Sequence, residues 1–123
     1  NTYYDKYIRV KYNQLKDSSK NTKYDDSKEY EDLDILLSIV KDLKLNIKFA
    51  ILPAHGKWSD YTGIGSEKRQ VAYNKLKEIA KNNNIEVMDY SSKEYEDYYM
   101  YDAMHLGWRG WIDFERDLYK LKK

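Results

Sequence analysis

The first 45 residues contain two groups of apolar positions at helical spacing, separated by a polar stretch over residues 16–27. The first group comprises Tyr4, Ile8, Tyr12 and Leu15. The second group is clearer and comprises Leu33, Leu36, Leu37, Val40 and Leu43. This spacing predicts two amphipathic helices joined by a loop. We expect Thr2 with Asp5 to cap the first helix, and Asp26 with Glu29 to cap the second.

Residues 46–89 carry the pattern of a strand, a helix and a second strand. Residues 46–52 are mostly apolar and are followed by the only proline, which is typical of a strand covered on both faces. Residues 54–65 are predicted to form a loop, Ser66 to cap a helix, and residues 85–89 to form the second strand. The expected buried stripe of the helix comprises Ala72, Leu76, Ile79 and Ala80. A connection of this kind gives parallel strands with a right-handed crossover.

Residues 90–123 are predicted to form a loop and then a closing helix. Six residues fall on one face of that helix, and nearly all are apolar: Trp108, Trp111, Ile112, Glu115, Leu118 and Tyr119. We therefore expect Trp111, Ile112 and Leu118 to be buried.

The predicted fold class is α/β, with a short parallel sheet flanked by helices in a single domain over residues 1–123. Two parallel strands cannot complete a sheet, and strands this apolar need neighbours on their edges and helices on both faces. We therefore expect a fragment of a larger α/β sheet; a sheet completed by another chain is the alternative. An open apolar edge also predicts that the isolated chain self-associates.

Composition excludes several classes of function. The 123 residues include 22 basic and 21 acidic side chains, interspersed along the chain, so no basic face is available for nucleic acid. The chain has no cysteine, which removes disulfides, thiolate zinc sites and cysteine nucleophiles. No run approaches the roughly 18 apolar residues of a membrane span.

The segment YDAMHLGWRGW, residues 101–111, places Asp102 three residues before His105. It follows the last predicted strand, where open α/β sheets place functional groups. A carboxylate that accepts a hydrogen bond from one imidazole nitrogen leaves the other nitrogen free as a general base. The alternative is a loop histidine that only caps backbone groups near the closing helix.

A general base of this kind needs a hydroxyl nucleophile. No serine of the chain lies in a Gly-x-Ser turn between a strand and a helix. The segment Gly63-Ile64-Gly65-Ser66 comes nearest, and there we interpret Ser66 as a plain helix cap. The nucleophile is therefore predicted to lie outside this chain.

His55 is the only other histidine, and with Trp58 and Tyr61 it is predicted to bind substrate in the cleft that His105 faces. Aromatic rings offer flat faces to sugar or polyol units, although most rings in a small domain serve packing. A metal site would be possible in principle, built from His55, His105, Asp60 and Asp102. The spacing does not favour it, and we expect no metal and no cofactor.

Three segments together resemble the C-terminal part of the DltD family. They are TYYDKY, ILPAHGKWSDYTG and EYEDYYMYDAMHLGWRGW, and the most specific piece is the run D-x-M-H-L-G-W-[KR]-G-W. The resemblance extends over essentially the whole chain. At His55 we would expect the family to carry a different polar residue, often Asn, so the resemblance assigns that residue no role.

The resemblance implies a function in D-alanylation of teichoic acids in Gram-positive bacteria. It implies that the chain is the C-terminal fragment of a three-layer, doubly wound domain similar to SGNH hydrolases. Asp102 and His105 would be the acid and base of a Ser-His-Asp set whose serine lies in an earlier block. Gly107 and Gly110 would allow close backbone approach, while Trp108 and Trp111 would anchor the helix behind the pair.

The resemblance also implies partners and a location. The partners would be teichoic acid or a D-alanyl carrier, and other proteins of the D-alanylation system. The intact protein would lie at the extracytoplasmic face of the cell membrane, anchored by an N-terminal segment absent from this chain. A non-enzymatic module that binds a polymer or partner, and a general SGNH esterase, are the alternative functions.

Overall fold

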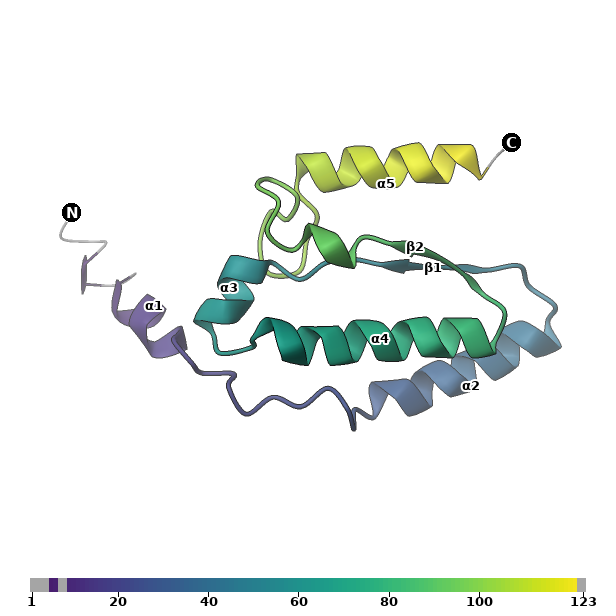
Figure 1. Cartoon of the computed structure of the whole chain (residues 1–123), viewed down its shortest axis with the longest axis horizontal. Coiled ribbons are helices and arrows are strands. Elements are labelled where there is room, and N and C mark those ends of the chain that lie inside the picture. Colours follow the sequence, from purple (N-terminus) through teal and green to yellow (C-terminus); the bar gives the residue numbers. More distant parts are fainter. Residues whose placement is uncertain (1–4, 7–8, 122–123) are drawn as a thin grey trace.

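A computed structural model describes residues 5–6 and 9–121 (Figure 1). Within them it contains five α-helices, two strands and one 3-10 helix, η2. In chain order these are α1 (Arg9–Leu15), α2 (Glu29–Asp42), β1 (Lys48–Ile51), α3 (Gly56–Tyr61), α4 (Ser66–Asn82), β2 (Glu86–Asp89), η2 (Ser91–Lys93) and α5 (Trp108–Lys120). The α/β class is therefore confirmed. The predicted cap at Thr2, with Tyr4 and Ile8, lies outside the described residues.

The two strands pair in parallel, as the strand, helix, strand pattern predicts. Phe49 is opposite Val87, and Ile51 is opposite Asp89. Figure 1 shows the strands between α5 on one side and α4 on the other. The carboxyl ends of both strands therefore open towards the segments that carry His55 and His105.

The buried core lies just beyond β2. It consists of Tyr90, Tyr99, Met100 and Leu106, against which Met88 and Phe114 pack. Phe114 belongs to α5, so this core holds the closing helix against the end of the sheet. It also encloses both ends of the loop over residues 101–105, because Met100 and Leu106 form an antiparallel bridge.

A short helix replaces part of the predicted loop over residues 54–65. Helix α3 begins at Gly56 because the side chain of His55 accepts a hydrogen bond from the amide of Trp58. Histidine is not among the usual capping residues, which is why the pattern did not predict this helix.

The two predicted side-chain caps that fall within the described residues, at Asp26 and Ser66, are wrong. The N-cap of α2 is Lys28, not Asp26, and it makes no side-chain cap bond. Ser66 is the first residue of α4, whose N-cap is Gly65. Gly65 has no side chain to accept a hydrogen bond, although glycine is among the residues commonly found at this position.

The prediction that Trp111, Ile112 and Leu118 are buried is also wrong. Their exposed fractions are 51%, 54% and 39%. Only the side of α5 that carries Phe114 meets the core, and Gly110 is the one residue of α5 that is buried. Trp108 and Tyr119, on the same apolar face, are 61% and 65% exposed.

The stripe predicted for α4 is partly confirmed. Ile79 and Ala80 are buried, whereas Ala72 and Leu76 are intermediate. Arg69 and Tyr73, which the prediction did not include, are also buried. None of the helices in the described part of the chain has the length and apolar character to span a membrane.

Candidate active site

The loop over residues 101–105 is shaped by Asp102. One carboxylate oxygen, Oδ1, accepts hydrogen bonds from the amides of Met104 and His105, at 2.8 and 2.9 Å. The amide of Tyr101 donates to the carbonyl of His105 at 2.8 Å and closes the loop. Aspartate forms such turns because its short side chain reaches the amides two and three residues ahead.

The same carboxylate holds the imidazole ring of His105. Nδ1 lies 2.8 Å from Oδ2 and 2.9 Å from Oδ1 of Asp102. The amide of Met104, the His105 ring and the His105 amide together lower the pKa of Asp102 to about 2. Asp102 is therefore a carboxylate at neutral pH and can only accept, so Nδ1 carries the proton. No described residue bonds to Nε2, and the side chain is 75% exposed.

Glycines let the backbone close beneath this pair. The amide of Gly107 donates to the carbonyl of Tyr99 at 2.7 Å, and a Cβ at Gly107 would meet the backbone of Tyr98. A Cβ at Gly110 would lie 2.5 Å from the carbonyl oxygen of Tyr99. The predicted close approach at both glycines is confirmed. Trp108 is 61% exposed, so Trp108 and Trp111 do not anchor the helix as predicted.

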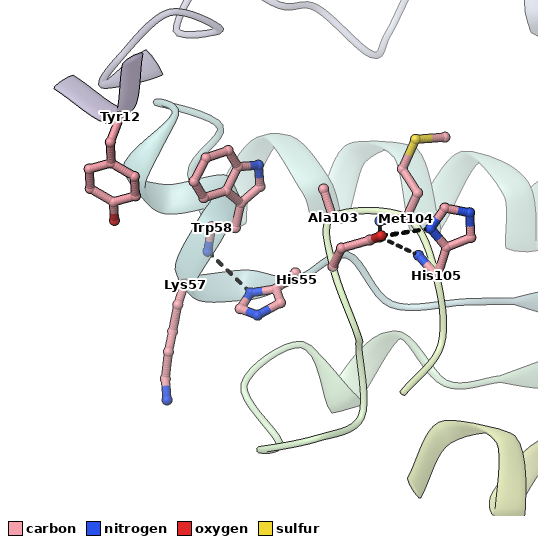
Figure 2. Close-up of a pocket in the computed structure, with 8 residues that line it drawn as sticks. Tyr12, His55, Lys57, Trp58, Ala103, Met104 and His105 are labelled. Carbon is pink, nitrogen blue, oxygen red and sulfur yellow. Dashed lines mark hydrogen bonds and ion pairs between the residues drawn. The ribbon is translucent and has the colours of Figure 1, made fainter. Parts of the chain in front are cut away.

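A pocket of about 580 Å³ joins this loop to the start of α3 (Figure 2). Its lining residues are Tyr12, His55, Lys57, Trp58, Asp102, Ala103, Met104 and His105. Figure 2 shows Ala103, Met104 and His105 on one loop and Lys57 and Trp58 on α3, with the Lys57 side chain extending away from the other labelled residues. The structure therefore brings His55 and Trp58 together with the Asp-His pair. Tyr12, Lys57, Ala103 and Met104 were not predicted.

Tyr61 does not line this pocket. Its ring stacks on that of Tyr12 with centroids 4.2 Å apart, and its hydroxyl donates to the carbonyl of Tyr12 at 2.8 Å. Trp58 lies 5.9 Å from both rings. Tyr61 thus packs behind Tyr12 and Trp58 and supports two walls of the pocket.

A buried ionic cluster lies beneath α3. The Arg69 guanidinium donates from Nε and Nη2 to the two carboxylate oxygens of Glu94, at 2.7 and 2.9 Å. It also donates to Asp60 at 2.7 Å and to the hydroxyl of Tyr95 at 2.8 Å. Burial opposes its charge, but the bonds to Glu94 and Asp60 outweigh that and raise the pKa of Arg69. A buried ion pair needs such complete hydrogen bonding to offset desolvation.

This cluster holds the backbone on both sides of His55. The amide of Ala54 donates to the hydroxyl of Tyr73 at 2.7 Å, and Tyr73 in turn donates to Glu94 at 2.8 Å. The amide of Gly56 donates to the carbonyl of Glu94, also at 2.7 Å. Sequence reasoning missed these residues. The available signal was spacing, because Arg69 and Tyr73 continue the stripe of Leu76 and Ala80 on α4.

Neither a metal centre nor a serine nucleophile accompanies the pocket within residues 5–6 and 9–121. No group of three or more His, Asp or Glu side chains there is arranged to hold a metal ion. No serine lines the pocket. What the described residues provide is an imidazole with a fixed tautomer beside an aromatic-walled cavity.

Comparison with known proteins places the chain in a family. The family model described as "DltD protein" matches residues 1–123. Protein DltD of Bacillus subtilis is 35% identical over 121 residues, which cover 96% of this chain and 31% of that protein. Protein DltD of Staphylococcus aureus is 32% identical over 97 residues, covering 79% of this chain and 25% of that protein.

A third relative, Protein DltD of Lacticaseibacillus rhamnosus, is 31% identical over 94% of this chain. The chain spans between a quarter and a third of the length of these curated relatives. The match over the whole chain shows that it belongs to the DltD family.

Proposed function

We propose that this chain supplies the histidine and aspartate of a Ser-His-Asp acyl-transfer site. The observation that carries the proposal is the contact of 2.8 Å between His105 Nδ1 and the Asp102 carboxylate, which leaves Nε2 without a partner among the described residues. This is the arrangement that a general base needs in order to accept a proton from a hydroxyl nucleophile.

In the proposed reaction, a serine from another part of the protein attacks the carbonyl carbon of an acyl ester. His105 Nε2 takes the serine proton as the new bond forms, and then gives it to the leaving oxygen as the old bond breaks. Asp102 stabilises the imidazolium formed in between. Further donors to the carbonyl oxyanion are expected beside that serine.

The proposed acyl group is D-alanine, and the proposed polymer is teichoic acid. Membership of the DltD family supports this assignment. The proposed location is the extracytoplasmic face of the cell membrane, with an anchor outside this chain. Teichoic acid, a D-alanyl carrier and the other D-alanylation proteins are then the expected partners.

We propose that β1 and β2 belong to a larger doubly wound sheet of the SGNH-hydrolase type. Two features of the chain support this. A two-stranded sheet is too small to be stable by itself. The apolar face of α5 is uncovered, with Trp111 and Ile112 about half exposed.

A fluorophosphonate, which reacts covalently with an activated serine, tests the proposed function. The full-length protein should be labelled on one serine, and His105→Ala should abolish labelling while leaving the thermal unfolding temperature unchanged. Labelling at the wild-type rate in His105→Ala would contradict the proposal.

A non-enzymatic binding module is the second candidate. The stacked rings of Tyr12, Trp58 and Tyr61 beside the pocket favour it, because aromatic faces bind polyol and sugar chains. This candidate predicts no labelling of the wild type. A general SGNH esterase would be labelled and would hydrolyse esters without preference for a D-alanyl group.

A further inference from the structure

We infer that His55 donates a hydrogen bond from Nε2 to an acceptor oxygen of the substrate bound beside His105. This inference rests on the proposed function and gives a chemical role to the second histidine of the pocket. It follows from the way in which each ring is held.

The tautomer of His55 is fixed by its role as a helix cap. Nδ1 of His55 accepts the hydrogen bond from the amide of Trp58, at 3.3 Å. A nitrogen that accepts from an N–H cannot carry a hydrogen itself, so in the neutral ring the hydrogen is on Nε2. No described residue bonds to this nitrogen, so Nε2–H is left as a free donor.

The tautomer of His105 is the opposite one. Its Nδ1–H donates to Asp102, and Nε2 presents a lone pair. Both rings line the same pocket. The pocket therefore offers one imidazole that accepts a proton and one that donates a hydrogen bond, which suits a substrate with a carbonyl oxygen near the attacked carbon.

The surroundings hold His55 in this orientation. The amides of its neighbours Ala54 and Gly56 are fixed at 2.7 Å by Tyr73 and by the carbonyl of Glu94. A Cβ at Gly56 would lie 2.7 Å from the ring of Tyr95, so the backbone cannot shift in that direction. A donor held this firmly costs little ordering entropy when a ligand binds.

Three substitutions distinguish the role of His55 as a helix cap from its proposed role as a hydrogen-bond donor. His55→Asn keeps an oxygen that can cap Trp58 and keeps an N–H donor. His55→Asp keeps the cap but has no donor, and His55→Ser keeps the cap without charge and with a much shorter reach. All three are good capping residues, so the thermal unfolding temperatures should stay close together.

The first measurement is long-range ¹H–¹⁵N NMR of the full-length protein with ¹⁵N-labelled histidine, at a pH of about 8. We expect the Nε2–H tautomer for His55 and the Nδ1–H tautomer for His105. A Nδ1–H tautomer at His55 overturns the inference whether or not the protein turns over any ester.

The second measurement is kcat/KM for p-nitrophenyl acetate with the same full-length variants. We expect His55→Asn to retain most of the rate, and His55→Asp and His55→Ser to lose at least about tenfold relative to it. Equal rates in all three variants overturn the inference. If His105→Ala abolishes turnover in that case, the proposed function still stands.

Discussion

At the scale of single residues, the Asp-His pair depends on one side chain that makes three hydrogen bonds. Asp102 orders its own loop through two amides and orients the His105 ring with the same carboxylate. The carboxylate and the ring are both exposed, so they contribute little to the buried core. Substitutions at this pair should therefore affect chemistry far more than folding.

The carboxylate of Asp102 should titrate unusually low. Its pKa in the folded protein is about 2, below the ordinary value of 3.8. A lowered pKa means that the stability Asp102 contributes is complete above about pH 4 and is lost as the pH falls through about 2. We predict a ¹³C NMR midpoint near pH 2 for this carboxyl carbon, and a higher midpoint in His105→Ala. A midpoint at 3.8 or above in the wild type would contradict the hydrogen bonding described.

Asp102→Asn should slow the proposed reaction, although the His105 imidazole is still present as the base. An amide at position 102 cannot accept from Nδ1–H and the two amides as a carboxylate does, so the ring loses its fixed tautomer. We expect kcat to fall by about 10²–10⁴-fold, and by no more than in His105→Ala. Kinetics of the full-length variants on one ester check this order. A larger loss in Asp102→Asn than in His105→Ala would show that Asp102 acts in another way.

Gly107 should be far less tolerant of substitution than Gly65. A Cβ at Gly107 meets the backbone of Tyr98, whereas a Cβ at Gly65 meets nothing within 4 Å. We predict that Gly107→Ala lowers the free energy of unfolding by about 1–3 kcal/mol and displaces the His105 loop. Gly65→Ala should cost about 1 kcal/mol or less, as a change of helix cap. Equal losses in urea denaturation would contradict the close approach at Gly107.

At the scale of elements, the ionic cluster of Arg69 connects four segments. Arg69 and Tyr73 come from α4, Asp60 comes from α3, and Glu94 follows η2. The fourth segment, after β1, joins through Ala54. The cluster therefore sets the position of α3 relative to the loop after β2, and so the shape of the pocket.

Removing both charges of the Arg69–Glu94 pair should cost less than the sum of the two single removals. Arg69→Met leaves Glu94 buried without a counter-charge, and we expect a loss of about 3–5 kcal/mol in the free energy of unfolding. The double variant Arg69→Met with Glu94→Gln should lose less than the sum of the two single variants. Urea denaturation of the wild type, the two single variants and the double variant gives the interaction free energy between the two side chains. Additive losses would show that the two side chains do not interact.

The elements also show how far the sequence could predict the fold. The parallel strands followed from apolar runs on either side of a helical pattern, and α2 and α4 from their spacing. Helix α3 could not be predicted, because an unusual cap at His55 starts it. The Arg69 cluster was missed because charged residues on helices are usually solvated, and its partner Glu94 lies 25 positions away.

The site was predicted in part. The Asp102 and His105 pair was indicated by three-residue spacing in a loop, and the close approach at Gly107 by the glycine itself. Pairing of His55 with that loop depends on which segments meet in space. Local spacing carries no information on such contacts, so the pocket itself could not be derived.

At the scale of the whole molecule, the chain exposes apolar surface that a stable protein would cover. On α5 the exposed residues include Trp111 and Ile112, and on α2 they include Ile35 and Leu36. The amphipathic pattern of a helix predicts that its apolar face is covered, but it does not indicate which part of the protein, or which partner, covers it. The burial predicted for α5 was wrong within this chain for that reason.

The isolated chain should self-associate through these faces. We predict concentration-dependent sedimentation, and a shift towards monomer in Ile112→Lys, which replaces apolar surface by charge. Because Ile112 is 54% exposed, the substitution should change the free energy of unfolding by only about 0.5 kcal/mol. Phe114→Ala, on the packed side of α5, is the control and should destabilise the fold instead. A monodisperse monomer at high concentration would contradict this prediction.

The most direct test of the central proposal is the rate of ester turnover by the full-length protein with and without the His105 imidazole. Wild type, His105→Ala and the control Lys75→Ala should be compared on a D-alanyl ester. Lys75 is exposed on α4 and does not line the pocket. We predict that turnover is lost in His105→Ala and retained in Lys75→Ala, with the fold unchanged in both. Wild-type turnover in His105→Ala would contradict the proposal and would make the Asp-His pair a structural feature of the loop.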